Sequence, residues 1–303
     1  MAFVILLASA AGSASARWTP PEQIFPDRAS SVSCASPSFC VMVGIDGYVS
    51  IFNGASWSAA TVLDSEVALE SVSCVSSAFC VAGDSAGRVH TFNGLDWSVP
   101  LKIDDAGIQS VSCTSPSFCM AVDSREIGRN TQRAMIFRGD LWSQPTRFDT
   151  ANYLFSVSCA APNFCVAVDY EGQAVTFTGR RWDKPKTING SALNSVSCPA
   201  IRFCVAVGLD NEVIRLKGGS WGRPRYIQHG SSGLGLNAIS CPSRTFCVTV
   251  DTHGRALTFR QGKWHAPHHI AGQSEGLTSV SCPSLSFCAV VDNRGRAMTY
   301  LAG

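Results

Sequence analysis

All 14 cysteines of the chain fall into seven pairs, and five residues separate the two cysteines of each pair. An even set of cysteines at one repeated spacing is typical of a disulfide framework. Zinc would need four soft ligands at one point, whereas each segment offers two thiols and no histidine at fixed spacing. The sequence therefore predicts seven local disulfides, each closing a hairpin: Cys34–Cys40, Cys74–Cys80, Cys113–Cys119, Cys159–Cys165, Cys198–Cys204, Cys241–Cys247 and Cys282–Cys288.

The cysteine pairs mark a repeat, because their first members lie 40, 39, 46, 39, 43 and 41 residues apart. This period is that of the four-stranded blades of a β-propeller. Each repeat, clearest over 156–188, holds four short apolar runs separated by turn residues. The second run, such as 203–207, is almost continuously apolar, as expected of a strand buried on both faces between blades. The Asp-x-x-Gly that follows predicts a tight turn.

The tryptophans indicate how the ring closes. Six of the seven follow a cysteine pair, but Trp18 precedes all of them, in a segment (17–24) that has the pattern of a fourth strand alone. The chain ends after the third-strand pattern of the last repeat, 297–300. We therefore predict an all-β, seven-bladed β-propeller in one domain, 17–303, whose last blade is closed by the N-terminal strand. Closure removes exposed sheet edges; an open β-solenoid or another ring geometry is the alternative.

Residues 1–16 combine an apolar run with an Ala14-x-Ala16 ending, which predicts a signal peptide cleaved before Arg17. The run is too short to anchor the chain in a bilayer, and no later segment approaches the roughly 20 apolar residues that a transmembrane helix needs. No Lys or Arg precedes the run, so a disordered apolar tail is the alternative. Export agrees with the predicted disulfides, and we expect a secreted or extracytoplasmic protein.

The repeated pattern S-V-S-C-x-S-x-x-F-C-V-A-V resembles that of secreted cysteine-repeat proteins of actinobacteria, which are predicted propellers. The segment from Gly54 to Trp57 also resembles the tail of the Asp-box, S-x-D-x-G-x-T-W, of sialidase-like propellers. Where that motif has Asp this chain has Phe52, and Phe92 and Phe177 stand at the same place in other blades. The resemblance therefore does not imply sialidase activity, and no arginine triad can be assigned.

Charge and motifs narrow the function classes. The 24 Lys and Arg nearly cancel the 22 Asp and Glu, so no net field favours nucleic acid, an anionic membrane or another polyanion. The sequence has no phosphate-binding loop and no serine paired with a base, and the repeated serines before each first cysteine are interpreted as strand residues. Our leading hypothesis is a non-catalytic recognition module, without cofactor, that binds a glycan or cell-envelope polymer through repeated blade sites. The alternatives are a hydrolase or lyase at the central channel and a protein-interaction scaffold.

The tryptophans are the candidate ligand-binding residues, because the CH faces of sugars stack well on indole. An aromatic residue at the same point of every repeat is also what packing between blades requires, and the pattern favours packing. The candidates for sugar binding are Trp57, Trp97, Trp142, Trp182, Trp221, Trp264 and Trp18.

Three further features are weighed in the same way. The repeated Asp (Asp84, Asp123, Asp169, Asp251 and Asp292) offers one carboxylate per turn, too few for calcium, and is interpreted as turn chemistry. His265, His268 and His269, with His253 nearby, could hold zinc or copper, but solvated side chains are the simpler interpretation, and we predict no metal site. The insertion from Arg125 to Arg133 is the candidate contact for a protein partner, and 228–236 is a second enlarged connection.

Overall fold

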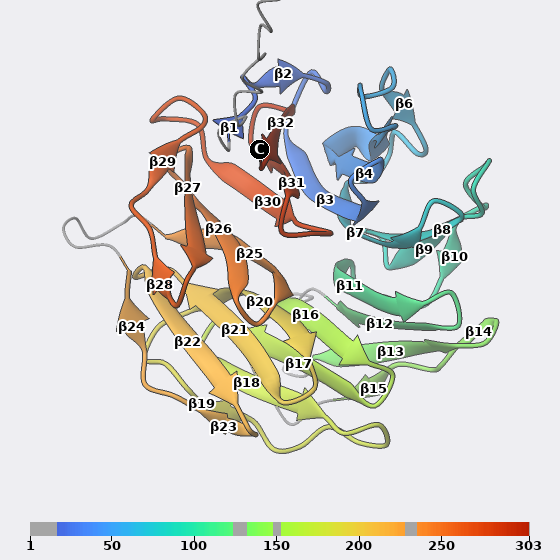
Figure 1. Ribbon diagram of the computed structural model, residues 1–303. Coiled ribbons are helices and arrows are strands. Elements are labelled where there is room, and N and C mark those ends of the chain that lie inside the picture. The colour runs from blue at the N-terminus through green and yellow to red at the C-terminus, as the bar shows by residue number, and fades with distance from the viewer. Residues whose placement is uncertain (1–16, 124–131, 148–152, 228–234, 303) are drawn as a thin grey trace, which may run out of the picture.

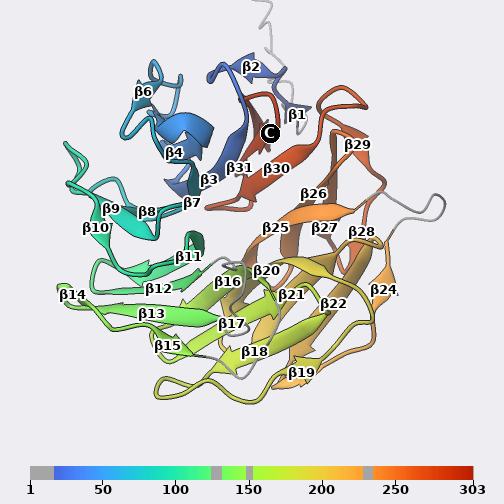
Figure 2. The ribbon, with the colours of Figure 1, turned by 180° about the vertical axis from the view of Figure 1, so that it is seen from behind.

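The computed structural model describes residues 17–123, 132–147, 153–227 and 235–302. Seven antiparallel sheets of four or five strands stand around a central axis (Figures 1 and 2). In the described residues the only helical element is one short 3-10 turn, η1 (Ile45–Gly47), and no helix there is long and apolar enough to cross a membrane. The predicted all-β, seven-bladed propeller is confirmed.

Each blade runs outward in chain order from an innermost strand, except that the N-terminal strands complete the last blade. The innermost strands of blades 1 to 7 are β3 (Ala29–Ser36), β7 (Leu69–Ser76), β11 (Ile108–Ser115), β16 (Leu154–Ala161), β20 (Leu193–Ala200), β25 (Leu236–Ser243) and β30 (Leu277–Ser281). The second strands are β4 (Phe39–Gly44), β8 (Phe79–Asp84), β12 (Phe118–Asp123), β17 (Phe164–Asp169), β21 (Phe203–Gly208), β26 (Phe246–Asp251) and β31 (Phe287–Asp292). The third strands are β5 (Tyr48–Phe52), β9 (Arg88–Phe92), β13 (Arg133–Arg138), β18 (Gln173–Phe177), β22 (Glu212–Lys217), β27 (Arg255–Arg260) and β32 (Arg296–Leu301).

The outermost position of each blade is occupied by short pairings that flank the tryptophan turn. These strands are β6 (Thr61–Val62), β10 (Leu101–Lys102), β14 (Leu141–Trp142), β15 (Thr146–Arg147), β19 (Lys186–Thr187), β23 (Ser220–Trp221), β24 (Arg225–Tyr226), β28 (Lys263–Trp264), β29 (His268–His269), β1 (Arg17–Trp18) and β2 (Glu22–Gln23). Pro lies next to several of them, which agrees with its preference for sheet edges, where its missing N–H costs nothing.

Blade 7 is built from both ends of the chain. Strand β1 pairs with β32, placing Trp18 opposite Tyr300, and β2 pairs with the same strand, placing Glu22 opposite Ala297. The C-terminus therefore lies beside the first described strand in Figure 1. The predicted closure by the N-terminal segment is confirmed.

The core consists of layers between neighbouring blades. Val41 and Val43 of blade 1, for example, pack with Val72 and Ala82 of blade 2. Because a second strand packs on both neighbours, both of its faces are buried, which explains its unbroken run of small apolar residues. All seven predicted disulfides are present, with 3.9 to 4.1 Å between the paired Cα atoms.

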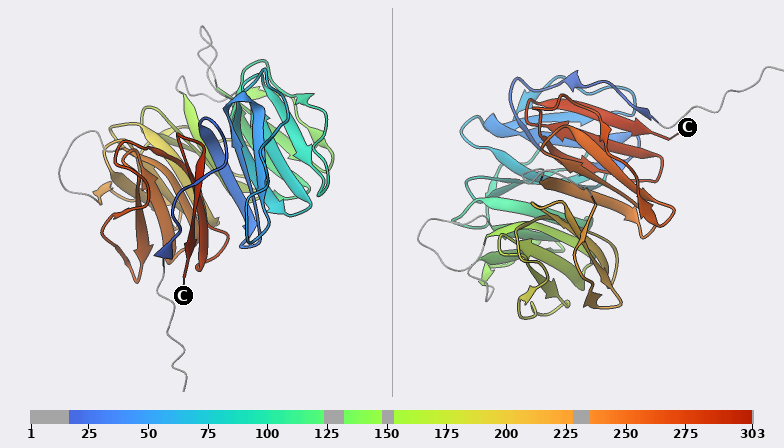
Figure 3. Two further views of the ribbon diagram at one scale, coloured as in Figure 1. Left: turned by 90° about the horizontal axis from the view of Figure 1, so that it is seen from above. Right: turned by 90° about the vertical axis from the view of Figure 1, so that its left-hand side faces the viewer.

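The ring has two different faces (Figure 3). We call the face where the innermost strands begin the aspartate face, because the Asp-x-x-Gly turns between second and third strands also lie there. The opposite, disulfide face holds the hairpins that the disulfides close and the Gly-x-x-Trp turns. The connection 124–131 lies outside the described residues.

Candidate functional site at the channel mouth

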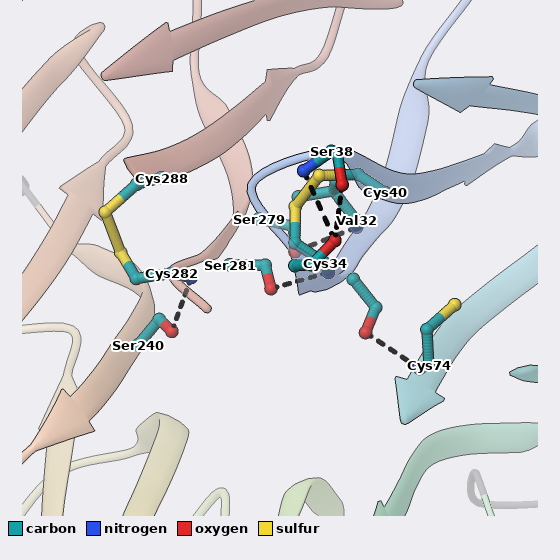
Figure 4. The surroundings of a disulfide bond; sticks show 12 residues. Val32, Cys34, Ser38, Cys40, Cys74, Ser240, Ser279, Ser281, Cys282 and Cys288 are labelled. Carbon is teal, nitrogen blue, oxygen red and sulfur yellow. Dashed lines mark hydrogen bonds between the residues drawn. A yellow bond between two sulfur atoms is a disulfide. The ribbon is translucent and has the colours of Figure 1, made fainter. Parts of the chain in front are cut away.

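Two serines of each innermost strand line the channel and link neighbouring blades. Ser71 Oγ accepts a hydrogen bond from the backbone N–H of Val111 at 3.0 Å, and Ser73 Oγ accepts one from Cys113 at 2.9 Å. The inner edge of each sheet faces the channel, so alternate N–H groups would otherwise have no partner in the protein. The same bonds recur around the ring. Figure 4 shows two of them, in which the N–H of Cys282 donates to Ser240 Oγ and the N–H of Cys34 donates to Ser281 Oγ. We call these serines the inner wall.

The inner wall has one exception. Blade 6 has Ala238 where the other blades have the first serine, so the N–H of Val280 has no serine hydroxyl from blade 6 to which it can donate. The serines are strand residues, as the sequence indicates. Their role in joining the blades escaped the sequence analysis, although the alternation S-V-S-C carries the signal.

One position before the inner wall, the residues stop repeating. Each of these side chains belongs to the start of an innermost strand, and together with Arg28 they surround a cavity of about 450 Å³ at the aspartate face. We call this set the mouth ring: Ser30, Glu70, Gln109, Phe155, Asn194, Asn237 and Thr278.

Three of the seven mouth-ring residues are held in place by the next blade. Asn194 Nδ2 donates to the carbonyl of Leu236 at 3.0 Å, and Asn237 Nδ2 donates to that of Leu277 at 2.8 Å. Thr278 Oγ1 donates to the carbonyl of Ala29 at 2.8 Å. These bonds fix the three side chains at the rim of the cavity.

Two other mouth-ring residues, Glu70 and Gln109, and the adjoining Arg28 are available to a ligand. Glu70, Gln109 and Arg28 make no side-chain hydrogen bond or ion pair with any described residue. Ser30 Oγ is buried and has no hydrogen-bond partner there. This sector of the mouth therefore offers one anion, one cation, one amide and one hydroxyl within a single cavity.

An aromatic cluster lies beside the mouth on blade 4. The ring of Phe155 lies 6.0 Å from that of Tyr170, which in turn lies 6.2 Å from that of Tyr153. Tyr153 and Tyr170 are 38% and 54% exposed. Large aromatic side chains held by one another lose little entropy on binding, so they make effective anchors at an interface.

The repeated aspartates form turns, as predicted. Asp251 is fully buried, and its Oδ1 accepts hydrogen bonds from the backbone N–H groups of His253 and Arg255 at 2.9 and 3.0 Å. Its Oδ2 accepts one from Arg255 Nε at 2.7 Å. These bonds occupy the carboxylate within its own turn, which leaves it poorly placed to ligate calcium.

The partners of these aspartates differ between blades, and so do their charges. Burial acts to raise the pKa of Asp84, but hydrogen bonds from His90 and Arg88 outweigh burial and lower it. In blade 3, burial dominates and raises the pKa of Asp123 to about 6, although Arg133 donates to it. Burial also raises the pKa of Asp104, which shares Arg133 with Asp123.

Two blades replace the aspartate. In blade 5 Gly208 takes its place, and the carboxylate comes instead from the third strand, where Glu212 is fully buried and accepts a hydrogen bond from Ser191 at 3.0 Å. A Cβ on Gly208 would lie 2.3 Å from Glu212 Oε1, so the Glu212 carboxylate occupies the space that an aspartate at position 208 would need. In blade 1 the polar pair is replaced by stacked rings, Phe25 and Tyr48, whose centroids are 5.5 Å apart.

The tryptophans lie far out on the blades, near the disulfide face. Six of the seven pack on an aromatic ring of the third strand, with centroids 5.3 to 5.4 Å apart, such as Trp97 on Phe92 and Trp18 on Tyr300. Trp221 instead stands opposite Leu216. The geometry is that of packing, which the sequence pattern favours, and no tryptophan lines the mouth cavity. Sugar binding at these residues stays a prediction.

The remaining candidates are not brought into one site. His268 and His269 are exposed on β29, whereas His265 Nε2 is buried, and the described residues contain no group of three or more potential metal ligands. Of the candidate contact from Arg125 to Arg133, residues 124–131 lie outside the described residues. Arg133 itself is buried on Asp123 and Asp104, and so it cannot serve as a surface contact. Most of 228–236 also lies outside the described residues.

Comparison with known proteins gives the fold and no family. The sequence matches no protein-family model and no curated protein. Among solved structures, the WD40 β-propeller domain of Doa1 superposes with a TM-score of 0.76 at 12% identity, covering 93% of this chain and 96% of that one. YCF48 bound to D1 peptide superposes with a TM-score of 0.74 at 12% identity, covering 94% and 97%. At such identity the likeness shows a shared propeller fold alone.

Proposed function

We propose that this protein is an extracytoplasmic recognition module that binds a segment of a partner protein at the mouth of its channel. The observation that carries the proposal is where the repeat breaks down. Seven blades present almost the same serines along the inner wall, yet one step nearer the aspartate face they present Ser, Glu, Gln, Phe, Asn, Asn and Thr. Asymmetry of this kind provides one distinctive site rather than seven equal ones.

The chemistry of the mouth suits a polypeptide segment. A peptide backbone presents both N–H donors and carbonyl acceptors, and Gln109 carries both complementary groups on one side chain. Glu70 and Arg28 add opposite charges to the same cavity. Tyr153 and Tyr170 stand beside it, so a polar segment entering the mouth could place an apolar side chain against them. The cavity volume is in the usual range for ligand pockets.

Two further lines of support come from outside the mouth. Seven disulfides are expected of an oxidising compartment, which agrees with export by way of residues 1–16. The solved structure of YCF48 is that of a complex with D1 peptide, so this fold can take a peptide as its ligand. Propellers of unrelated sequence carry different ligands, and the support extends to the class of partner only.

The other two hypotheses receive less support. A hydrolase or lyase at the channel would need a second acid or base, whereas Glu70 is the one carboxylate among the described residues that line the cavity. Glycan binding at seven equal tryptophan sites must be reconciled with indoles that pack on the third strand, and with surroundings that differ from blade to blade.

The test is selection of peptides from a random displayed library on the protein spanning residues 17–303, followed by measurement of Kd for the selected peptides. We expect the Glu70→Ala, Gln109→Ala double variant to weaken binding at least tenfold, because both groups are exposed to the ligand. A matched control is the Asp140→Ala, Gln144→Ala variant, which removes one carboxylate and one amide from the outer rim. Binding that survives the mouth variant, or that is weakened equally by the control, would overturn the proposal.

A further inference from the structure

Exposed basic side chains gather on blades 3 to 5, on the outer strands and tryptophan turn and, at Arg202, on the inner hairpin of blade 5. We call this set the basic rim: Arg147, Arg180, Arg181, Lys184, Lys186 and Arg202. Asp183 is the one acidic residue among them, so the rim carries a net charge of six minus one, or +5. The whole chain carries +2, and the remainder of the molecule is therefore net negative, at −3. The overall balance conceals this concentration of charge.

The basic rim surrounds two adjoining cavities. One, of about 360 Å³, lies between the outer strand of blade 3 and blade 4, and it is lined by Arg147, Arg181 and Trp182. The second, of about 580 Å³, lies between blades 4 and 5 and is lined by Lys186, Arg202 and Trp221. Asp183 and Lys184 line both cavities, so this segment of blade 4 forms the ridge between them.

These positive charges have no ion-pair partner among the described residues. None of the six basic side chains forms an ion pair with a residue in the part of the chain that the structure describes. Elsewhere the chain pairs its buried arginines closely, as with Arg255 on Asp251 at 2.7 Å. Six like charges kept together cost electrostatic energy that a bound anion would relieve.

We propose that the basic rim binds an anionic polysaccharide, a chain of sugars that carry carboxylate, sulfate or phosphate groups. The half-buried indoles of Trp182 and Trp221 supply apolar surface for the CH faces of sugar rings. Guanidinium and ammonium groups around them bind the acidic substituents, arginine in bidentate fashion. This site lies on the outer strands and disulfide-face turns of blades 3 to 5 and shares no residue with the mouth ring, so it extends the molecule's function beyond the proposed binding of a protein segment.

Blade 2 is a natural contrast within the same chain. Its tryptophan turn carries Leu95 and Asp96 before Trp97 and Val99 after it, in the positions where blade 4 has Arg180, Arg181 and Lys184. The indole packs on its third-strand ring at almost the same distance in both blades, 5.3 and 5.4 Å. Packing explains the tryptophan in each blade, but it does not explain the cations of blade 4. An anionic ligand would explain them.

An acidic peptide is the rival ligand, because it too would be attracted by the rim. The two tryptophans favour sugars, since a run of acidic side chains gains little from an indole, whereas pyranose rings stack on it. The two ligands therefore differ in how much they depend on Trp182, and this difference decides between them.

The experiment measures binding of residues 17–303 to dextran sulfate, polygalacturonate, neutral dextran and polyglutamate by calorimetry, at low and at physiological salt. We expect both anionic polysaccharides to bind and neutral dextran not to bind, with affinity falling as salt rises. The Arg180→Ser, Arg181→Ser variant should weaken polysaccharide binding at least tenfold. Trp182→Leu, checked for folding by circular dichroism, should weaken it about threefold to tenfold through loss of stacking.

The Lys102→Ala, Lys263→Ala variant is the control, because it removes two exposed charges elsewhere and leaves the same net charge as the arginine variant. It should bind polysaccharide as the unchanged protein does. Equal loss in the control, equal binding of neutral dextran, or tight polyglutamate binding that Trp182→Leu leaves unchanged would each overturn the proposal. The mouth variant Glu70→Ala, Gln109→Ala should leave polysaccharide binding intact, which separates the two proposed sites.

Discussion

The inner wall and the aspartate face are made from the same seven repeats, and they differ in how closely the repeat is kept. Along the inner wall, Ser71 bonds to Val111 as Ser110 bonds to Val157, at 3.0 and 3.1 Å. At the aspartate face, the turn of blade 2 holds its Asp with His90 and Arg88, while that of blade 5 has moved the carboxylate to Glu212. The inner wall is the same in nearly every blade, whereas at the aspartate face two blades lack the aspartate and the partners of the others differ.

The difference follows from geometry. An inner-wall residue must satisfy the N–H of the next blade and fit a closed ring, so any change affects two sheets at once. A residue at the aspartate face has solvent or its own turn on one side, and several arrangements satisfy it equally well. Function can therefore vary at the aspartate face while the inner wall keeps the ring together.

The largest effect that would sharpen this comparison concerns pH, because Asp84 and Asp123 occupy the same turn position with opposite pKa directions. Asp123 has a pKa of about 6 in the folded state against an ordinary 3.8, so its contribution to stability is complete below 3.8 and lost as the pH rises through 6. Two pKa units correspond to about 3 kcal/mol. Asp123→Asn should therefore gain stability relative to the unchanged protein between pH 4 and pH 7.

Asp84 should behave in the opposite way. Its pKa is lowered by folding, so its contribution is present above 3.8 and lost as the pH falls below that value. Asp84→Asn should thus destabilise the protein at pH 7, and the difference should shrink in acid. Urea unfolding of Asp123→Asn between pH 4 and pH 7, and of Asp84→Asn between pH 2.5 and pH 5, measures the two slopes. Slopes of the same sign would show that the two turns do not differ.

A smaller and uniform effect is expected from the disulfides, which belong to the repeating part of the structure. Each closes a loop with a sequence separation of six, for which the chain-entropy estimate is about 2 kcal/mol. The Cys74→Ala, Cys80→Ala variant and the Cys198→Ala, Cys204→Ala variant should lose this amount equally in urea unfolding. Unequal losses would mean that blades 2 and 5 differ in their inner hairpins too. Alkylation of the purified protein without reductant should label no cysteine.

The repeating part of the structure could be predicted almost completely from the sequence. The spacing of the cysteines predicts the blades and the disulfides, because the pair occurs in every repeat. Trp18 predicts the closure, because the fourth-strand pattern is missing from the last repeat and stands before the first. Counting the strand patterns at the two ends of the chain is enough to predict that Trp18 pairs with the strand of Tyr300. Repetition makes such inferences dependable, since seven copies average out the irregularities of any one.

The candidate sites could not be predicted in the same way. Gln109 and Glu70 are ordinary polar residues in sequence, and they converge only because two innermost strands begin at the same face. The basic rim joins Arg147 and Arg202, which are distant in the chain, and an overall charge near zero concealed it. Arg133 looked like part of an exposed loop, because nothing in the sequence shows that Asp104 and Asp123 bury it.

The inner wall can be tested by one substitution that should lower the free energy of unfolding and one that should raise it. Ser71→Ala removes the acceptor for the N–H of Val111 and should cost about 1 kcal/mol, the usual worth of a partly buried hydrogen bond. Ala238→Ser supplies the acceptor that Val280 lacks and should gain up to about 1 kcal/mol. Urea unfolding measures both. Stabilisation at 238 is the decisive outcome, because few substitutions stabilise a protein without a specific reason. A loss there would mean that the inter-blade bonds do not add to stability.

The smallest effect is expected at the mouth ring, where the comparison can be broken most directly. Gln109→Ala should change the free energy of unfolding by less than about 0.5 kcal/mol, because the side chain bonds to no described residue. Its neighbour Ile108 is fully buried, and Ile108→Ala should cost about 2 kcal/mol or more in the same measurement. A large loss from Gln109→Ala would show that the mouth ring, like the inner wall, holds the blades together. Its variation between blades would then follow from packing, and the argument that it recognises a ligand would fail.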